Sequence, residues 1–213
     1  MSTLAPAISK NSIVLALFAI ACTSTVGLVH LLTKDRIEIQ AQQQLIEQLN
    51  EIIHIDSHDN EMFRDCIAAP KDNNSDLTVD VIYRARFNNK PIAAAIKTVA
   101  PDGYNGNIEL LIAIKADGSV SGVRTLRHKE TPGLGDKIEL RKSDWIEKFS
   151  GKKIINNNDK RWAVIKDGGM FDQFTGATIT PRAVVKTVRK TINYFKTNQE
   201  SIFTTASNCG AKE

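Results

Sequence analysis

The sequence predicts an α+β protein with an N-terminal transmembrane helix, and three observations support this fold class. Residues 13–32 contain no Asp, Glu, Lys or Arg, short segments between 79 and 127 alternate apolar and polar residues, and residues 181–198 repeat apolar residues at helical spacing. A helix of about twenty apolar residues spans the hydrocarbon core of a bilayer. Alternation with a period of two indicates half-buried strands. Mostly antiparallel strands with flanking helices follow from this order of elements.

Size and charge limit the classes of protein to which the chain can belong. The 213 residues are 42% apolar, which suits one compact domain plus an additional segment. The formal net charge is +4, and no basic tract is interleaved with aromatic residues. We therefore expect no nucleic-acid partner.

The apolar run at 13–32 favours an uncleaved anchor behind a short N-terminal tail, residues 1–12. A secretory signal peptide has a shorter apolar core of about 7–15 residues. One alternative stays open, because the letters AIAC at 19–22 resemble a lipoprotein cleavage box with Cys22 as the lipidated residue. The orientation does not follow from charge, since Lys10 and the α-amino group on one side balance Lys34 and Arg36 on the other.

Residues 33–78 are predicted to form a helical linker followed by a loop. Apolar residues recur at near-helical spacing over 34–53, with Gln and Glu between them, which indicates a helix that continues out of the membrane. Residues 54–78 are polar and rich in Asn and Asp. His54 and His58 are four residues apart, but their surroundings match no metal-binding motif, so we predict no metal site.

The soluble domain is predicted to cover residues 79–198, with a polar tail at 199–213. Alternation and turn residues predict strands at 79–87, 91–100, 107–115, 119–127 and 161–166, with turns at 88–90, 101–106, 116–118 and 167–169. A Pro/Gly loop at 130–137 precedes a helix within 138–151, and the last helix begins at Pro181.

Two cysteines lie outside the apolar run, and they stand near opposite ends of the predicted domain. A bridge between Cys66 and Cys209 would tie both ends down and would indicate an oxidising compartment. Two unrelated thiols are the alternative, and the sequence leaves both open.

The stretch DQFTGATITPR at 172–182 places three threonines just before the last helix. Thr180 followed by Pro181 matches an N-cap and the first helical residue. The positive end of a helix favours a phosphate, and Gly176 and Ala177 would let such a group approach the backbone. Thr178 then offers a hydroxyl beside it. The alternative is that all three threonines are ordinary capping or turn residues.

The same stretch resembles the flavinylation motif D-x-x-S/T-G-A-T-x-S/T of proteins that carry FMN in a phosphoester bond to threonine. The resemblance implies covalent FMN on Thr178, attached from FAD by a separate, Mg²⁺-dependent flavin transferase. The other motif positions are matched by Asp172, Thr175, Gly176, Ala177 and Thr180.

The segments PDGYNG, HKETPGLGDKIE and TGATITPRAVV, in this order behind one anchor, are similar to the G subunit of Rnf-type ion-translocating electron-transport complexes, called Rsx in enteric bacteria. The resemblance implies a single-pass protein of the bacterial inner membrane with a periplasmic FMN-binding domain. Other subunits of the complex and the lipid bilayer would be its partners. It would relay electrons between NADH and ferredoxin, coupled to Na⁺ or H⁺ translocation, and would be a subunit of a translocase rather than an enzyme on its own.

The second motif, ETPGLG at 130–135, is implied to lie beside the isoalloxazine ring. Glu130 and Thr131 would bond ring heteroatoms, and Gly133 and Gly135 would let backbone approach the ring. Leu134 is either a ring contact or part of the core. A Pro/Gly surface turn is the alternative for the whole motif. Two aromatic residues elsewhere are candidate neighbours of the flavin, Tyr104 and Trp145.

Two rival functions remain at this stage. The C subunit of the Na⁺-translocating NADH:quinone reductase is a relative with the same FMN motif. An anchored binding or assembly module without covalent flavin would use the TGAT loop only to begin a helix.

Overall fold

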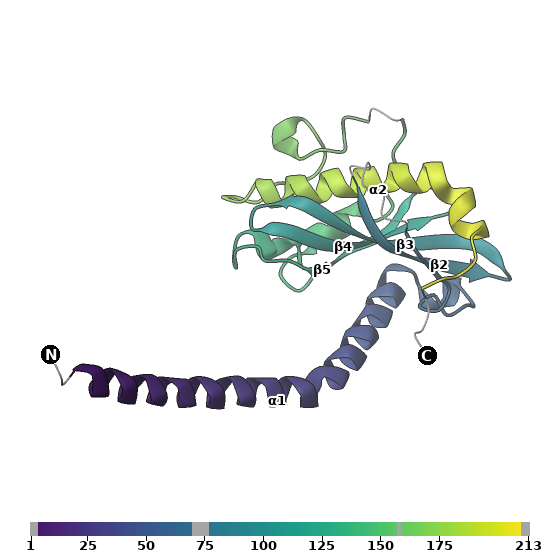
Figure 1. Ribbon diagram of the computed structural model, residues 1–213. Helices are drawn as coiled ribbons and strands as arrows, with labels where there is room; N and C mark the ends of the chain where they lie inside the picture. Colours follow the sequence, from purple (N-terminus) through teal and green to yellow (C-terminus); the bar gives the residue numbers. More distant parts are fainter. Residues whose placement is uncertain (1–3, 70–76, 157–158, 210–213) are drawn as a thin grey trace. The chain divides into compact units, whose positions relative to one another are not determined.

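The computed structural model describes residues 4–69, 77–156 and 159–209, which form two compact units divided after Ile46 (Figure 1). The first unit is most of one helix. The second unit, from Glu47 onward, contains the sheet and the other helices.

Helix α1 (Leu4–Ile52) contains the predicted membrane span. Its part from Ile8 onward is long and apolar enough to cross a membrane, with a mean hydropathy of 2.2 in its most apolar window. The side chains of Leu15, Phe18 and Leu31 are exposed there. The hydroxyl groups of Thr23 and Thr25 donate to carbonyl oxygens four residues earlier, each over 2.8 Å. These bonds satisfy the hydroxyl groups of both threonines, as a lipid environment favours.

The second unit is built on a five-stranded antiparallel sheet, which confirms the predicted α+β class. The strands pair in sequence order, and they are β1 (Cys66–Ala68), β2 (Thr78–Phe87), β3 (Lys90–Gly103), β4 (Gly106–Lys115) and β5 (Val120–Arg127). Asn88 and Asn89 join β2 to β3 with φ angles of 48° and 62°. Two positive φ angles in a two-residue loop are typical of the type I′ hairpin, which suits the twist of the strands.

Several elements differ from the prediction. Strand β3 continues to Gly103 because a bulge absorbs the residues after Ala100, so the turn shrinks to Tyr104 and Asn105. Strand β1 lies inside the region predicted as a loop. Residues 161–166 are not a strand. Val164 makes one isolated bridge to Phe171, and a short 3₁₀ helix, η4 (Ile165–Asp167), follows.

Where a helix was predicted within 138–151, the structure has a 3₁₀ segment, η3 (Asp144–Phe149). A second 3₁₀ segment, η2 (Gly135–Ile138), lies mostly in the predicted Pro/Gly loop. Ser143 caps η3 by accepting a hydrogen bond from the backbone N–H of Trp145 over 3.1 Å. Apolar side chains of both segments are buried, so packing decides their conformation.

Helix α2 (Ile179–Thr204) covers one face of the sheet and closes the main core (Figure 1). Isoleucine and valine side chains from β2 to β5 meet Val184, Val188, Ile192 and Phe195 of the helix. The helix continues beyond Asn198 because Ile202 and Phe203 are also buried. Residues 199–204 are therefore helical rather than part of a polar tail.

The opposite face of the sheet is lined by small residues. Ala93, Ala95, Ala113 and Gly122 are buried there, and the end of α1 buries Leu49, Ile52 and Ile53. A Cβ atom added to Gly122 would lie 2.9 Å from Cβ of Ile52. The small residues thus leave room for the last turn of the long helix.

We expect Gly122→Ala to lower the free energy of unfolding by about 1–3 kcal/mol, because overpacking forces a backbone shift. Urea denaturation of the detergent-solubilised chain, followed by circular dichroism, measures this change. In an Ile52→Ala background the added methyl group should cost less, because Cγ2 of residue 52 is gone, although its Cβ remains. A single variant as stable as the parent would contradict this packing.

The C-terminal end of α2 is held by buried charge. Arg84 is 2% exposed, and its guanidinium donates to the carbonyl oxygens of Ile202 and Thr205 and pairs with Asp65. Arg86 donates to the carbonyl of Phe203 over 2.7 Å. Cations at these carbonyls satisfy the unpaired groups of the helix end.

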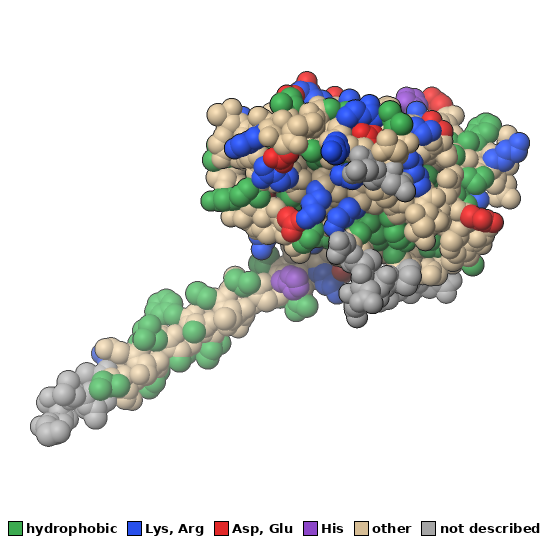
Figure 2. Space-filling view, turned by 90° about the horizontal axis from the view of Figure 1, so that it is seen from above, with side chains coloured by type: hydrophobic (Ala, Val, Ile, Leu, Met, Phe, Trp, Pro, Cys, Tyr) green, Lys and Arg blue, Asp and Glu red, His purple; other side chains and the backbone are tan. Residues whose placement is uncertain are grey.

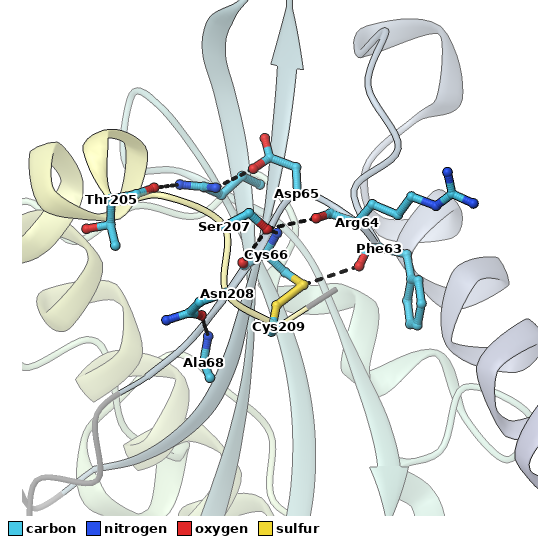
Figure 3. The surroundings of a disulfide bond; sticks show 10 residues. Phe63, Arg64, Asp65, Cys66, Ala68, Thr205, Ser207, Asn208 and Cys209 are labelled. Carbon is cyan, nitrogen blue, oxygen red and sulfur yellow. Dashed lines mark hydrogen bonds and ion pairs between the residues drawn. A yellow bond between two sulfur atoms is a disulfide. The ribbon is translucent and has the colours of Figure 1, made fainter. Parts of the chain in front are cut away.

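The chain then runs beside β1, where a disulfide joins Cys66 to Cys209 (Figure 3). Their Cα atoms are 5.6 Å apart, which is an ordinary separation for a disulfide. The side-chain oxygen of Asn208 accepts a hydrogen bond from the backbone N–H of Ala68 over 2.7 Å. The backbone N–H of Asn208 donates to the carbonyl of Cys66 over 3.0 Å. The sequence left open a disulfide or two unrelated thiols, and the structure contains the disulfide.

Candidate cofactor-binding site

The TGAT motif forms a tight turn that enters α2. The N–H of Ala177 donates to the carbonyl of Phe174 over 3.1 Å, and Gly176 has a φ of 80°. Glycine adopts this conformation without strain. A Cβ atom at Gly176 would lie 3.6 Å from Cδ2 of Leu134, so the turn sits against the ETPGLG loop.

Helix α2 begins earlier than predicted, and Thr180 is not its N-cap. Thr178 occupies the N-cap position, and its carbonyl accepts a hydrogen bond from the N–H of Arg182 over 3.3 Å. Pro181 is tolerated in the first turn because amides there have no partner within the helix. The side chain of Thr178 makes no capping hydrogen bond and is half-buried. Its hydroxyl group can therefore bond a ligand.

Glu130 connects the two motifs. Its side chain is 5% exposed, and its carboxyl oxygens accept hydrogen bonds from the hydroxyl of Thr180 and, over 3.0 Å, from the N–H of Asn105. One buried carboxyl group thus ties together the ETPGLG loop, the β3–β4 turn and the first turn of α2. The resemblance had implied that Glu130 bonds the ring. In the structure, both carboxyl oxygens have partners within the chain.

The glycines of the second motif have different structural roles. A Cβ atom at Gly135 would lie 2.8 Å from Oε2 of Glu130 and 2.9 Å from Oγ1 of Thr180, so a side chain there would disrupt the connection. Gly133 has a φ of 77° and open space around it, so it serves the turn.

A cavity of about 630 Å³ lies between the two motifs. Its volume is in the range of small-molecule and cofactor sites. The residues that line it are Tyr104, Glu130, Thr131, Leu134, Gly135, Lys166, Gly176, Ala177, Thr178, Ile179 and Thr180. The structure therefore brings together most of the predicted site residues, including Thr178 and most of ETPGLG.

Three predicted site residues, and one of the two candidate aromatic neighbours, do not line this cavity: Asp172, Thr175, Gly133 and Trp145. Two residues that the sequence did not predict, Lys166 and Ile179, do line it. Lys166 lies in a segment predicted as a strand, and no local pattern connects it to the motifs. Only the fold of residues 161–171 brings it to the cavity.

Asp172 and Trp145 brace the TGAT turn from outside the cavity. The indole N–H of Trp145 donates to the carbonyl of Asp172 over 2.8 Å, and its ring lies 5.1 Å from that of Phe174. The carboxylate of Asp172 pairs with the ammonium of Lys148. The hydrogen bond to Asp172 raises the pKa of Lys148 above its usual value. Asp172 therefore helps to hold the TGAT turn in place and does not contact the cavity.

His128 supports the other motif. Its Nδ1 accepts a hydrogen bond from the N–H of Glu130 over 3.0 Å, so the proton of the neutral ring is on Nε2, which faces Glu139 at 2.8 Å. The hydrogen bond from His128 and a second one from Arg141 lower the pKa of Glu139. His128 is not among the residues that line the cavity, and the residues it bonds are Glu130 and Glu139.

The cavity suits a group with one anionic and one planar apolar part. The first turn of α2 and Lys166 are among the residues that line it, and both favour an anion. Tyr104, Leu134 and Ile179, whose side chains are exposed, also line the cavity and supply apolar surface.

We expect Thr180→Val to destabilise the protein by about 1–3 kcal/mol, because Oε2 of Glu130 loses its buried partner. Chemical denaturation measures the change. Thr191→Val is the matched control, since Thr191 is equally buried in α2 but bonds only the helix carbonyl of Thr187, over 2.8 Å. Equal losses in the two variants would show that the Glu130–Thr180 bond adds nothing.

Comparison with known proteins identifies the family. The model of the FMN-binding domain matches residues 103–193, and the model of the RnfG N-terminal region matches residues 1–52. The G subunit of the ion-translocating oxidoreductase complex of Vibrio atlanticus (strain LGP32) is 50% identical over 206 residues, which cover 97% of this chain and 99% of the relative.

Similar values hold for the proteins of the same name in other bacteria. The Shewanella oneidensis protein is 52% identical over 95% of this chain and 96% of the relative. The Pseudoalteromonas atlantica protein is 47% identical over 95% of this chain and 94% of the relative. These similarities do not favour the alternative of a quinone-reductase C subunit. The chain belongs to the family of G subunits of ion-translocating oxidoreductase complexes.

Proposed function

We propose that the chain carries FMN in a phosphoester bond to Oγ1 of Thr178 and works as a fixed electron carrier of its complex. The position of Thr178 supports this most directly: its hydroxyl makes no capping bond, it lines the cavity, and it stands at the positive end of α2. A phosphodiester keeps one negative charge, which this helix end stabilises.

The cavity fits the cofactor. Gly176 and Ala177 would keep side-chain bulk away from the phosphate, and Lys166 lines the same cavity. The isoalloxazine ring would rest against Leu134 and Tyr104, with Thr131 available to bond a heteroatom. Glu130 and Gly135 would hold the loop in shape rather than contact the ring through the carboxyl group.

When bound, flavin accepts one or two electrons, and the protein's task is to hold it in place. The covalent bond would make occupancy of the site independent of free FMN. The flavin would then stay at one place in the domain, because its attachment point lies in a hydrogen-bonded turn at the start of α2, whose other end is held by Arg84 and Arg86.

Attachment requires a flavin transferase that uses FAD and Mg²⁺. The oxygen of Thr178 would form a bond to the phosphorus on the FMN side of FAD, and the P–O–P bond would break. AMP would leave, and the hydroxyl proton would pass to the solvent or to a base of the transferase. The neighbouring turn leaves Thr178 half-buried and accessible to such a partner.

We place the soluble domain on the periplasmic side of the inner membrane, with α1 as a single anchor in the bilayer. Disulfides persist in oxidising compartments, and the Cys66–Cys209 bridge is consistent with the periplasm. There the chain would relay electrons among other subunits, between NADH and ferredoxin, in the redox-driven movement of Na⁺ or H⁺.

Peptide mass spectrometry of the protein, matured together with its transferase, tests the proposal. We expect the mass addition of FMN, as a phosphoester, on the peptide that contains Gly176 to Thr180, with fragmentation assigning it to Thr178. An unmodified peptide, with all yellow colour released by acid precipitation, would instead support a module without covalent flavin.

A further inference from the structure

The ETPGLG loop begins with a hydrogen bond that depends on the charge of the His128 ring. The backbone N–H of Glu130 donates to Nδ1 of His128 over 3.0 Å. A ring nitrogen accepts such a bond only while it carries no proton. Histidine is the side chain that commonly gains a proton between about pH 8 and pH 5. The first bond of this loop is therefore sensitive to pH in the physiological range.

The other ring nitrogen keeps its partner in both charge states. Nε2 lies 2.8 Å from Oε1 of Glu139, and it carries the proton of the neutral ring. Hydrogen bonds from His128 and from Arg141 lower the pKa of Glu139, so its carboxylate stays ionised as the pH falls. A proton added to the ring therefore goes to Nδ1, where it faces the N–H of Glu130. The hydrogen bond is then replaced by a repulsion between two donors.

Little else near His128 competes with this pair. Figure 2 shows Lys, Arg, Asp and Glu side chains at the surface of the protein, where water and salt screen their charges. The side chains of His128 and Glu139 are only 10% and 22% exposed. Of the cations that flank His128 in sequence, Arg127 pairs with Glu109 over 2.7 Å, and Lys129 is exposed. Within the described residues, Glu139 is the only charged side chain that bonds the ring.

The bond to His128 fixes a residue on which the cavity around Thr178 depends. The carboxyl group of Glu130 joins this loop to the first turn of α2. The rest of the loop folds back on itself, because the N–H groups of Leu134 and Gly135 both donate to the carbonyl of Thr131 over 3.1 Å. A shift of Glu130 would therefore move this wall of the cavity.

We propose that His128 is a positioning residue for the cavity, which holds Glu130 in place while its Nδ1 is unprotonated and releases it as the pH falls. The movement of the loop follows from the contacts of this chain alone. Its effect on a flavin rests on the proposed function.

NMR of the full chain in detergent, produced without a flavin transferase, tests the movement. Labelling with ¹⁵N-histidine follows the charge and the tautomer of the ring, and the chain has 4 His. Labelling with ¹³C-carbonyl lysine and ¹⁵N-glutamate selects two amides, because Lys–Glu occurs only at 129–130 and 212–213. Lys212→Arg removes the second pair and thus assigns the signal of Glu130.

We expect Nδ1 of His128 to be the unprotonated nitrogen at pH 8. Hydrogen exchange of the Glu130 amide is measured relative to an unfolded amide at the same pH. Its protection should fall by about tenfold as the ring gains its proton, because the amide loses its acceptor.

Two variants separate the hydrogen bond from the ring. His128→Asn keeps an acceptor, since Asn side chains bond the backbone two residues on, but it gains no proton. Protection of the Glu130 amide should then stay within about twofold between pH 8 and pH 5. His128→Gln can still donate to Glu139 but places no acceptor near Glu130, so protection should be low at both pH values. His54→Asn, at a side chain that is 81% exposed, should behave like the parent.

Three results would overturn the proposal. They are a His128 ring that gains no proton above pH 5, a Glu130 amide that does not follow the ring, and equal protection in the Asn and Gln variants. If the Gln variant does not fold, the first two results still decide, because both come from the parent protein.

Protein that carries the flavin tests the effect on the cofactor. The absorption spectrum of the oxidised flavin should change together with the His128 titration, and it should stay constant in His128→Asn. A spectrum as constant in the parent as in the variant would show that His128 does not position the cofactor. An unmodified Thr178 peptide would instead refute the proposed function and leave the amide result standing, so the two fail separately.

Discussion

Thr178→Ala should abolish covalent flavin and leave the domain folded. The fluorescent band of the parent protein under ultraviolet light on a denaturing gel is expected to disappear, since the only proposed acceptor oxygen is gone. The fold should survive because the Thr178 side chain makes no capping bond that Ala would remove. Loss of a capping bond would cost about 1 kcal/mol, and here the cost should be smaller. Circular dichroism and thermal unfolding provide the check on folding.

Matched variants separate the acceptor from its neighbours. Thr175→Ala should keep the fluorescent band, because Thr175 is exposed and does not line the cavity. Thr180→Val should keep the band at least in part, although we expect the protein to be less stable. A Thr178→Ala protein that still fluoresces in the gel, or a Thr175→Ala protein that does not, would place the phosphoester on another hydroxyl.

Removing the disulfide should destabilise the soluble domain by about 2–5 kcal/mol. The bridge joins residues 143 positions apart, so it restricts a long loop of the unfolded chain. Its loss also loosens the segment after α2, where Asn208 and Ser207 bond the backbone around β1. Urea denaturation of Cys66→Ala/Cys209→Ala against the parent measures the difference.

The remaining cysteine provides the control. Cys22 is a free thiol in α1, so Cys22→Ala should leave the stability of the domain unchanged. A reducing agent should shift the midpoint of the parent toward that of the double variant and should not affect the double variant. A parent protein whose midpoint does not respond, although its thiols become titratable, would show that the bridge contributes nothing.

Local sequence patterns predicted most of the sheet and both long helices. Alternation found β2 to β5, and Asn88 and Asn89 marked their first hairpin, because such preferences depend on neighbours in sequence. Strand β1 was missed because its three residues are too few to show an alternation of apolar and polar side chains. Its conformation depends on pairing with β2, which the sequence of β1 does not reveal. The strand predicted at 161–166 was wrong, since Trp162 is buried against Phe149 and Phe171 while Ile165 is exposed in η4.

The sequence by itself determined the membrane-spanning run, the antiparallel hairpins and the two motifs that resemble a flavin site, because each depends on residues close together in the chain. The tertiary structure decided that Glu130 bonds Thr180, that Lys166 reaches the cavity, that Cys66 meets Cys209 and that α2 begins at Ile179. The first three bring together residues that are distant in sequence. The start of α2 depends on the contact between Thr180 and Glu130. Their partners are chosen by the packing of α2 on the sheet, which no local pattern contains.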